Sequence, residues 1–165
     1  MKFIQTKLKK VQIIEYSSFS DTRGSFCEIY NKEFFNKNGN KVKFLTDSFS
    51  YSSKHVLRGL HGDFQTWKLI TCVKGSIYLV VVNNINYEKE YKRWINLELS
   101  KEFNTSLLVP PGYGVGYFVK SKEAIVHYKQ STLYERKKQF SIKWNDKNFD
   151  FKWPSKKPIL SERDK

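Results

Sequence analysis

The stretch Lys68–Val82, KLITCVKGSIYLVVV, decides the fold class of this chain. Two short runs rich in Val, Ile, Leu and Tyr flank the tripeptide Val73–Gly75, and their composition is typical of strands. A glycine in such a break supplies the backbone freedom that a tight turn needs. We therefore predict two buried strands, Lys68–Val73 and Ser76–Val82, joined by a hairpin turn.

Strand-like composition recurs along the chain, whereas helical periodicity is weak. Asn31–Asn38 is compatible with two helical turns that face Phe34 and Phe35 inward, and Ser100–Phe103 with one turn. Pro110–Gly112 predicts a sharp turn into the next strand. Short strands with Gly-marked turns favour an all-β jelly-roll sandwich over alternating βα units. The further strands that we predict are Val11–Tyr16, Ser25–Tyr30, Thr105–Pro110, Gly116–Lys120 and Ala124–Thr132.

The length of 165 residues, without repeats or a Pro/Gly linker, indicates one domain over residues 1–165. No apolar run approaches the roughly 20 residues of a membrane span, and the N-terminus has no signal-peptide pattern. We expect no membrane association and a cytoplasmic location. Cys27 and Cys72 stand far apart, so we expect two free thiols, buried or half-buried.

The chain is strongly basic, with 30 Lys and Arg against 16 Asp and Glu, a formal net charge of +14. Such a charge suits a nucleic acid or a small polyanion such as a nucleotide diphosphate, and composition alone does not separate these partners. The lysines are scattered in pairs such as Lys9–Lys10, and no recognition-helix motif is present. We therefore expect no nucleic-acid partner.

Three short segments carry residues suited to chemistry. VLRGLH ends in His61, at the start of a polar loop before the strand at Lys68, and a histidine can serve as a general base near neutral pH. DTRGSFCE combines Arg23 with Gly24, which suits close approach to a phosphate. AIVHYKQSTLYER holds Tyr128 and Tyr134, and a buried phenol can act as a general acid. Taken alone, each of these residues is more often structural than functional.

The sequence lacks the motifs of metal-dependent, nucleophilic and nucleotide-cofactor chemistry. His61 is followed by Gly62 and Asp63, so the His-x-His pair of metal-binding cupins is absent, and no His/Cys cluster has ligand spacing. The chain contains no G-x-S-x-G elbow, P-loop or G-x-G-x-x-G. We expect neither a metal nor an organic cofactor.

Seven segments in fixed order resemble the dTDP-4-dehydrorhamnose 3,5-epimerase family of nucleotide-sugar epimerases, over about residues 15–164. They are DTRGSFCEIY, VLRGLH, KLITCVKGSIYLVVV, LLVPPGYGVGYFV, HYKQSTLY, WND and SERD. The resemblance implies a jelly-roll of the cupin type, usually a homodimer, that works on a nucleotide-diphosphate sugar without a cofactor.

The resemblance also implies roles for individual residues. His61 matches the catalytic base, Asp164 the carboxylate that pairs with it, and Tyr128 the proton donor, while Lys68 resembles the lysine near the ketone. The substrate-contacting positions are matched by Arg58 and Arg23 for phosphate and sugar, Phe26 and Glu28 for base and ribose, Tyr134 for the sugar pocket, and Asp47 and Ser48 for the sugar nucleotide.

Three departures from the family pattern bear on the substrate. His61 and Lys68 are only seven positions apart, Thr46–Ser48 replaces Gln-Asp-Asn, and Pro-Pro-Gly-Phe-Ala-His-Gly-Phe reads PPGYGVGY, so that Val115 replaces a histidine. The short loop resembles a subgroup that acts on GDP-4-keto-6-deoxy-heptose in surface-polysaccharide synthesis. We therefore predict inversion at C3, C5 or both of that sugar.

Three alternatives stay open. A dTDP-4-keto-6-deoxyglucose 3,5-epimerase has the same chemistry on another substrate. A sugar-nucleotide 3,4-ketoisomerase shares the fold, but typically carries closely spaced histidines where this chain has only His61. A non-catalytic sugar-nucleotide binding module is the third, and the loss of the histidine at Val115 is its only support.

Overall fold

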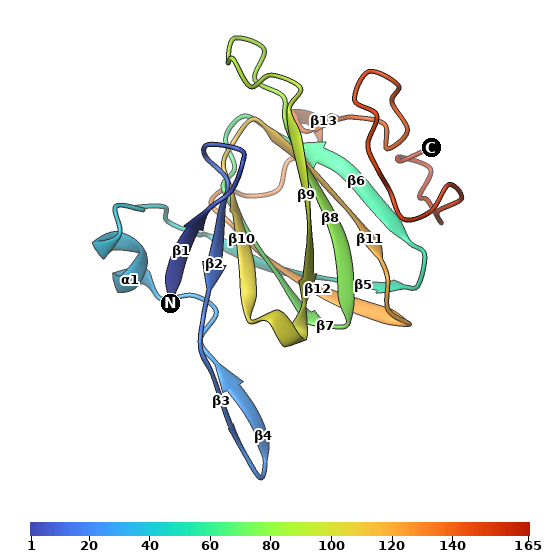
Figure 1. Cartoon of the computed structure of the whole chain (residues 1–165). Coiled ribbons are helices and arrows are strands. Elements are labelled where there is room, and N and C mark those ends of the chain that lie inside the picture. Colours follow the sequence, from blue (N-terminus) through green and yellow to red (C-terminus); the bar gives the residue numbers. More distant parts are fainter.

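Thirteen strands form two antiparallel sheets and one separate hairpin in a computed structural model that describes all 165 residues (Figure 1). The six-stranded sheet has the order β1 (Lys2–Gln5), β2 (Gln12–Glu15), β10 (Thr105–Val109), β7 (Lys68–Lys74), β12 (Glu123–Gln130), β5 (Thr46–Ser53). The five-stranded sheet has the order β13 (Phe140–Ser141), β6 (Leu57–Gly62), β11 (Tyr113–Val119), β8 (Ser76–Asn83), β9 (Trp94–Ser100). The hairpin pairs β3 (Ser18–Asp21) with β4 (Gly24–Cys27).

The chain changes sheets at the turn that the sequence predicts to be a hairpin. Strand β7 pairs with β10 and β12, whereas β8 pairs with β11 and β9, so the two strands that flank Gly75 share no hydrogen bonds as neighbours. The hairpin prediction is therefore wrong, and the segment is a corner between sheets. Facing strands of a sandwich are both buried, so their composition matches that of a hairpin core. The predicted Pro110–Gly112 turn is confirmed, and it is a second corner, from β10 to β11.

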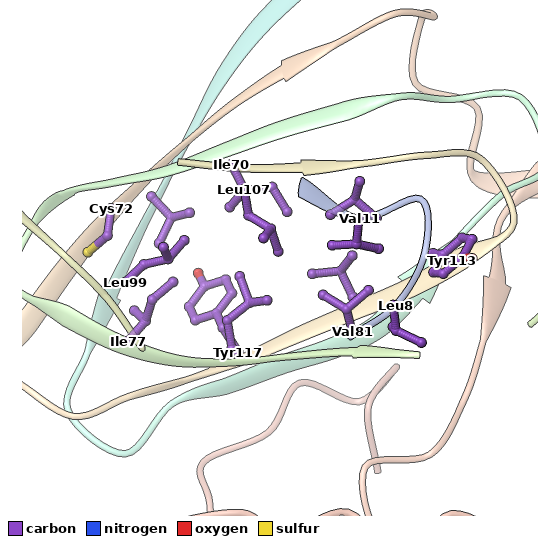
Figure 2. Packing of buried hydrophobic residues seen from close by; sticks show 14 of the residues in the cluster. Leu8, Val11, Ile70, Cys72, Ile77, Val81, Leu99, Leu107, Tyr113 and Tyr117 are labelled. Carbon is purple, nitrogen blue, oxygen red and sulfur yellow. The ribbon is translucent and has the colours of Figure 1, made fainter. Parts of the chain in front are cut away.

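The main core fills the space between the sheets (Figure 2). Ile70 and Leu107 of the six-stranded sheet face Ile77, Val81 and Tyr117 of the other sheet, all of them buried. Because successive side chains of a strand point to opposite faces, Val80 and Val82 lie on the outer face, and they are equally buried. Both faces of the five-stranded sheet are therefore covered.

Two further segments cover the outer faces of the sheets, one on each sheet. The C-terminal segment, residues 143–165, lays Phe149, Phe151 and Trp153 over Val80 and Val82. The indole of Trp153 donates a hydrogen bond to the Trp144 carbonyl at 2.7 Å, which holds the segment in its fold. On the six-stranded sheet, α1 (Lys32–Lys37) buries Phe35 against Ile14, Leu69 and Leu108. None of the helices is long and apolar enough to cross a membrane.

Several predicted elements are confirmed within a few residues. The jelly-roll sandwich and α1 are as predicted, with Asn31 accepting the capping hydrogen bond from the Phe34 amide, and η1 (Lys101–Phe103) is the predicted single turn. A second short helix, η2 (Arg136–Lys138), lies outside the predictions. Strand β11 begins at Tyr113, three residues before the prediction, and β4 ends at Cys27.

Other expectations are corrected. The sequence analysis missed β1, β3, β5, β6, β9 and β13; β1, β3 and β13 are short, and β5 is rich in polar residues, as TDSFSYSS shows. His61 lies within β6 and not in a loop, because β6 pairs with β11 and places His61 opposite Val115. Both thiols are free, but Cys27 is exposed on the projecting hairpin and only Cys72 is buried.

The corner at Gly75 yields a stability prediction. Gly75 has a φ of +73°, and an added Cβ would meet the Glu123 carbonyl oxygen at 2.1 Å, whereas Gly39, with a φ of +78°, has open space around it. Gly39→Ala measures backbone strain alone, about 1–2 kcal/mol. Gly75→Ala adds the clash, so we expect a loss of about 2–5 kcal/mol in the free energy of unfolding. Equal losses for the two variants in urea titrations would contradict this account.

Candidate active site

Both sheets and the C-terminal segment contribute to one cleft of about 530 Å³. The six-stranded sheet supplies Ser48, Lys68, Tyr128 and Gln130, and the five-stranded sheet supplies Arg58, His61, Val115 and Tyr117. The residues that follow β12 add Tyr134, Gln139, Ser161, Arg163 and Asp164. The structure therefore brings together all four predicted catalytic residues, with Arg58, Ser48 and Tyr134.

The short loop between β6 and β7 places His61 opposite Lys68. The chain crosses between sheets within this loop, so the two side chains reach the same cleft from different sheets. Asp63 organises the loop: its Oδ1 accepts from the Gln65 and Thr66 amides at 2.9 and 2.6 Å, and its Oδ2 from Gln139 Nε2 at 2.8 Å. The short spacing that the sequence shows is thus stabilised by one buried carboxylate.

His61 and Asp164 form a close contact at the cleft wall. His61 Nε2 lies 2.7 Å from Asp164 Oδ1, and neither of these buried atoms has another polar partner. The imidazole keeps 24% of its side-chain surface exposed, whereas the Asp164 side chain keeps only 4%. Because Nε2 faces the carboxylate, a neutral imidazole with its hydrogen on Nε2 leaves the Nδ1 lone pair free to accept a proton.

The surroundings of Asp164 keep it ionised. Burial alone would raise its pKa, but the contact with His61 and the hydrogen bond from Ser161 Oγ, 2.9 Å from Oδ2, outweigh burial and lower the pKa below its ordinary value. An ionised carboxylate stabilises the imidazolium that forms when His61 takes up a proton. This pair therefore has the geometry of a base with its orienting group.

Lys68, Arg58 and Arg163 make the cleft cationic. Burial lowers the pKa of the Lys68 ammonium, the Asp63 charge opposes that shift, and the Arg163 charge adds to it. Lys68 Nζ lies 3.5 Å from the His61 carbonyl oxygen. Arg163 donates to the Tyr134 hydroxyl at 3.3 Å. Three cations around one carboxylate suit an anionic ligand and a negative charge that develops during reaction.

Tyr128 faces the cleft from the sheet opposite His61. Burial, and secondarily the neighbouring Tyr117 phenol, raise the pKa of Tyr128 well above its ordinary value. The phenol is therefore protonated at neutral pH and can donate a proton. His61 on one sheet and Tyr128 on the other therefore flank whatever occupies the cleft.

Four predicted substrate residues lie away from this cleft. Arg23 and Phe26 lie on the β3–β4 hairpin, and Glu28 follows it, accepting a hydrogen bond from Asn31 at 3.0 Å. Asp47 points to the outer face of β5, where His127 Nε2 and Lys129 Nζ each lie 2.7 Å from its Oδ1.

The sequence analysis missed five cleft residues, namely Tyr117, Gln130, Gln139, Ser161 and Arg163. Arg163 and Ser161 belong to the SERD segment that was singled out for Asp164 alone, so the neighbouring positions carried a usable signal. Tyr117 belongs to PPGYGVGY, two positions after Val115, the residue by which this segment departs from the family pattern. Nothing in the sequence marks Gln130 or Gln139.

Comparisons with known proteins agree with this geometry. The sequence profile described as dTDP-4-dehydrorhamnose 3,5-epimerase matches residues 5–165. A protein of that name from Shigella flexneri is 36% identical over 168 residues, covering 99% of this chain and 93% of its own length.

Solved structures agree as well. The Bacillus anthracis dTDP-4-dehydrorhamnose 3,5-epimerase with bound TDP and pyrophosphate has a TM-score of 0.94 at 34% identity and covers 99% of this chain and 95% of its own. A Legionella pneumophila dTDP-6-deoxy-D-glucose-3,5-epimerase, in complex with dTDP-4-keto-L-rhamnose, has a TM-score of 0.94 at 30% identity. The match covers 99% of this chain and 89% of the Legionella chain. The fold, the cleft and these matches lead to one conclusion: this chain belongs to the dTDP-4-dehydrorhamnose 3,5-epimerase family.

Proposed function

We propose that this protein inverts C3 and C5 of dTDP-4-keto-6-deoxyglucose. The observation that carries the proposal is His61, backed by the buried Asp164, facing Tyr128 across a cationic cleft. The relatives described above are named for dTDP-linked sugars, which favours this substrate over the GDP-4-keto-6-deoxy-heptose that the short loop suggested. The GDP-heptose expectation has no support from the comparisons.

The chemistry follows from the ketone at C4. A carbonyl acidifies the C–H bonds at both neighbouring carbons, so a base of ordinary strength can remove one of these protons when the enolate is stabilised. In our proposal His61 Nδ1 takes the proton, and Asp164 stabilises the imidazolium. The Lys68 ammonium, close to His61, stabilises the enolate oxygen. Tyr128 then delivers a proton from the opposite sheet, which inverts the carbon.

Isotope exchange tests the substrate and the reaction together. In heavy water, we expect deuterium at C3 and C5 of dTDP-4-keto-6-deoxyglucose with inversion at both carbons, read by NMR and mass spectrometry. GDP-4-keto-6-deoxy-heptose is the competing substrate. Faster exchange of the GDP sugar would overturn the nucleotide assignment, a single inverted carbon would overturn the regiochemistry, and a carbonyl moved to C3 would identify a ketoisomerase.

Substitutions test the base and its orienting group. His61→Asn should lower exchange by roughly 10²–10⁴-fold, which is the usual contribution of a positioned general base. Asp164→Asn should lower it roughly 10²-fold or more, since the imidazolium loses its counter-charge. Asp150→Asn is a matched control, because Asp150 lies in the same segment but pairs with Lys152 in solvent. Full activity of a folded His61→Asn variant would refute the assignment of the base.

We also propose a homodimer in which the β3–β4 hairpin reaches the partner's cleft. The hairpin projects from the body of the chain (Figure 1) and exposes Phe19 and Phe26, at 70% and 73%. Edge strand β5 exposes Phe49 and Tyr51 on its outer face, at 56% and 69%. Apolar surface of this kind on a projecting hairpin and on a sheet edge favours association between copies.

Subunit mixing tests the dimer. One variant carries His61→Asn, and the other carries Arg23→Ala with Phe26→Ala on the hairpin. Each is expected to be nearly inactive alone, whereas a heterodimer would contain one intact site, so random mixing should restore roughly a quarter of wild-type activity. Mixing His61→Asn with Asp164→Asn, two lesions of the same cleft, should restore nothing. Absence of recovery in the first mixture, or a monomer in sedimentation, would contradict the proposal.

A further inference from the structure

The residues that lead into β13 lie beside the loop between β6 and β7. Strand β13 pairs antiparallel with β6, and this register sets Phe140 opposite Gly62. One step further along the register, Gln139 lies next to Asp63, and Gln139 Nε2 donates to Asp63 Oδ2 at 2.8 Å. Gly62 permits this close pairing, because an added Cβ there would meet the Phe140 ring at 2.4 Å.

This contact fixes the direction in which the Gln139 amide faces. An ionised carboxylate only accepts hydrogen bonds, so the amide nitrogen of Gln139 must face Asp63. Asp63 is itself held in place: it is buried, and its Oδ1 accepts from the Gln65 and Thr66 amides at 2.9 and 2.6 Å. Because the amide group is planar and trigonal, Gln139 Oε1 then points away from Asp63.

The carbonyl end of this amide belongs to the cleft. Gln139 lines the cleft, whereas Asp63 does not. Gln139 Oε1 has no hydrogen-bond partner in the protein, and it is open to solvent. The cations of the cleft, Lys68, Arg58 and Arg163, donate hydrogen bonds and never accept them. Gln139 Oε1 is therefore a free acceptor among side chains that mostly donate.

We propose that Gln139 binds a ring hydroxyl of the sugar through Oε1, and that Asp63 is the positioning residue that holds the amide in this orientation. The inference rests on the proposed epimerase function. A hydroxyl brings a hydrogen that needs an acceptor, and a carbonyl oxygen held at a fixed place supplies one. In dTDP-4-keto-6-deoxyglucose, C4 is the ketone and C6 is a methyl group, so the hydroxyls available are those at C2 and C3.

The short loop thereby gains a role in substrate selection. Asp63 belongs to the segment HGDFQTWK, which joins His61 to Lys68, and its partner Gln139 comes 76 positions later in the chain. One oxygen of the carboxylate closes the loop, and the other orients an amide at the cleft wall. A site built to hydrogen-bond a hydroxyl discriminates against an analogue that lacks it.

Analogues that lack one hydroxyl test the contact. Deuterium uptake at C5 in heavy water gives kcat/KM for dTDP-4-keto-6-deoxyglucose and for its 2-deoxy and 3-deoxy analogues. Gln139→Met keeps the length of the side chain, removes its amide, and should lower kcat/KM for the natural substrate about tenfold, the effect of one hydrogen bond. One of the two analogues should react about tenfold more slowly than the natural substrate with wild type, but within about twofold of it with Gln139→Met. The intrinsic reactivity of an analogue is the same with both proteins, so it cancels from this comparison.

A paired exchange tests the positioning role of Asp63. Gln139→Glu sets two carboxylates against each other and should lower kcat/KM about tenfold or more. In the double variant Asp63→Asn with Gln139→Glu, the Gln65 and Thr66 amides keep the asparagine oxygen, so its NH2 group replaces Oδ2 and donates to the new carboxylate. The second oxygen of that carboxylate then faces the cleft as an acceptor. We expect kcat/KM to return to within about threefold of wild type, together with the preference for the hydroxyl.

Gln65→Met is the matched control. Gln65 lies in the same loop, its exposed side chain does not line the cleft, and the substitution keeps its backbone amide, so the preference for each hydroxyl should stay at the wild-type value. A wild-type preference in folded Gln139→Met, whether its rates are normal or lowered equally for all three sugars, would overturn the inference while leaving the epimerase intact. A double variant no better than Gln139→Glu would overturn the role of Asp63. Wild-type protein that exchanges no deuterium at C5 would overturn both the inference and the proposed function.

Discussion

The fixed spacing between the two sheets governs the rest of the molecule. Facing sheets pack about 10 Å apart, so every inward side chain must meet one from the other sheet. Over most of this interface the meeting groups are aliphatic, as where Ile70 and Leu107 face Val81. Where β5, β6, β11 and β12 meet, the inward groups are hydroxyls, His61 and Arg58, and the same spacing leaves a cleft. The same sandwich therefore contains both an apolar core and a polar cleft.

Burial acts strongly on the pKa values of the ionisable residues in the cleft. Desolvation pushes the pKa of Lys68 down and that of Tyr128 up, while Asp164 stays ionised because it is paired. These shifts have different causes, and they leave Tyr128 protonated and Asp164 ionised at neutral pH. Such control needs little movement, because the groups stand on strands whose other residues form the core.

Sequence reasoning reached the fold class, α1 and four residues of the cleft, His61, Lys68, Tyr128 and Asp164, but not the pairing of strands. KLITCVKGSIYLVVV reads as a hairpin because facing strands of a sandwich and adjacent strands of a sheet show the same buried composition. The serines of β5 look like a loop until β12 pairs with them and turns them inward. The hydrogen bonds of Tyr117 with Ser50 and Ser52 depend on which hydroxyls meet between β5 and β11, and that alignment is a property of the packed sheets.

The C-terminal segment also makes the order of folding matter. Its aromatic residues dock on the outer face of a sheet that is complete without them, whereas Asp164 reaches a histidine 103 positions earlier in the chain. The sandwich can therefore form before this segment docks. Until it docks, His61 has no carboxylate beside Nε2, so the His61–Asp164 pair depends on the aromatic contacts that hold the segment against β8.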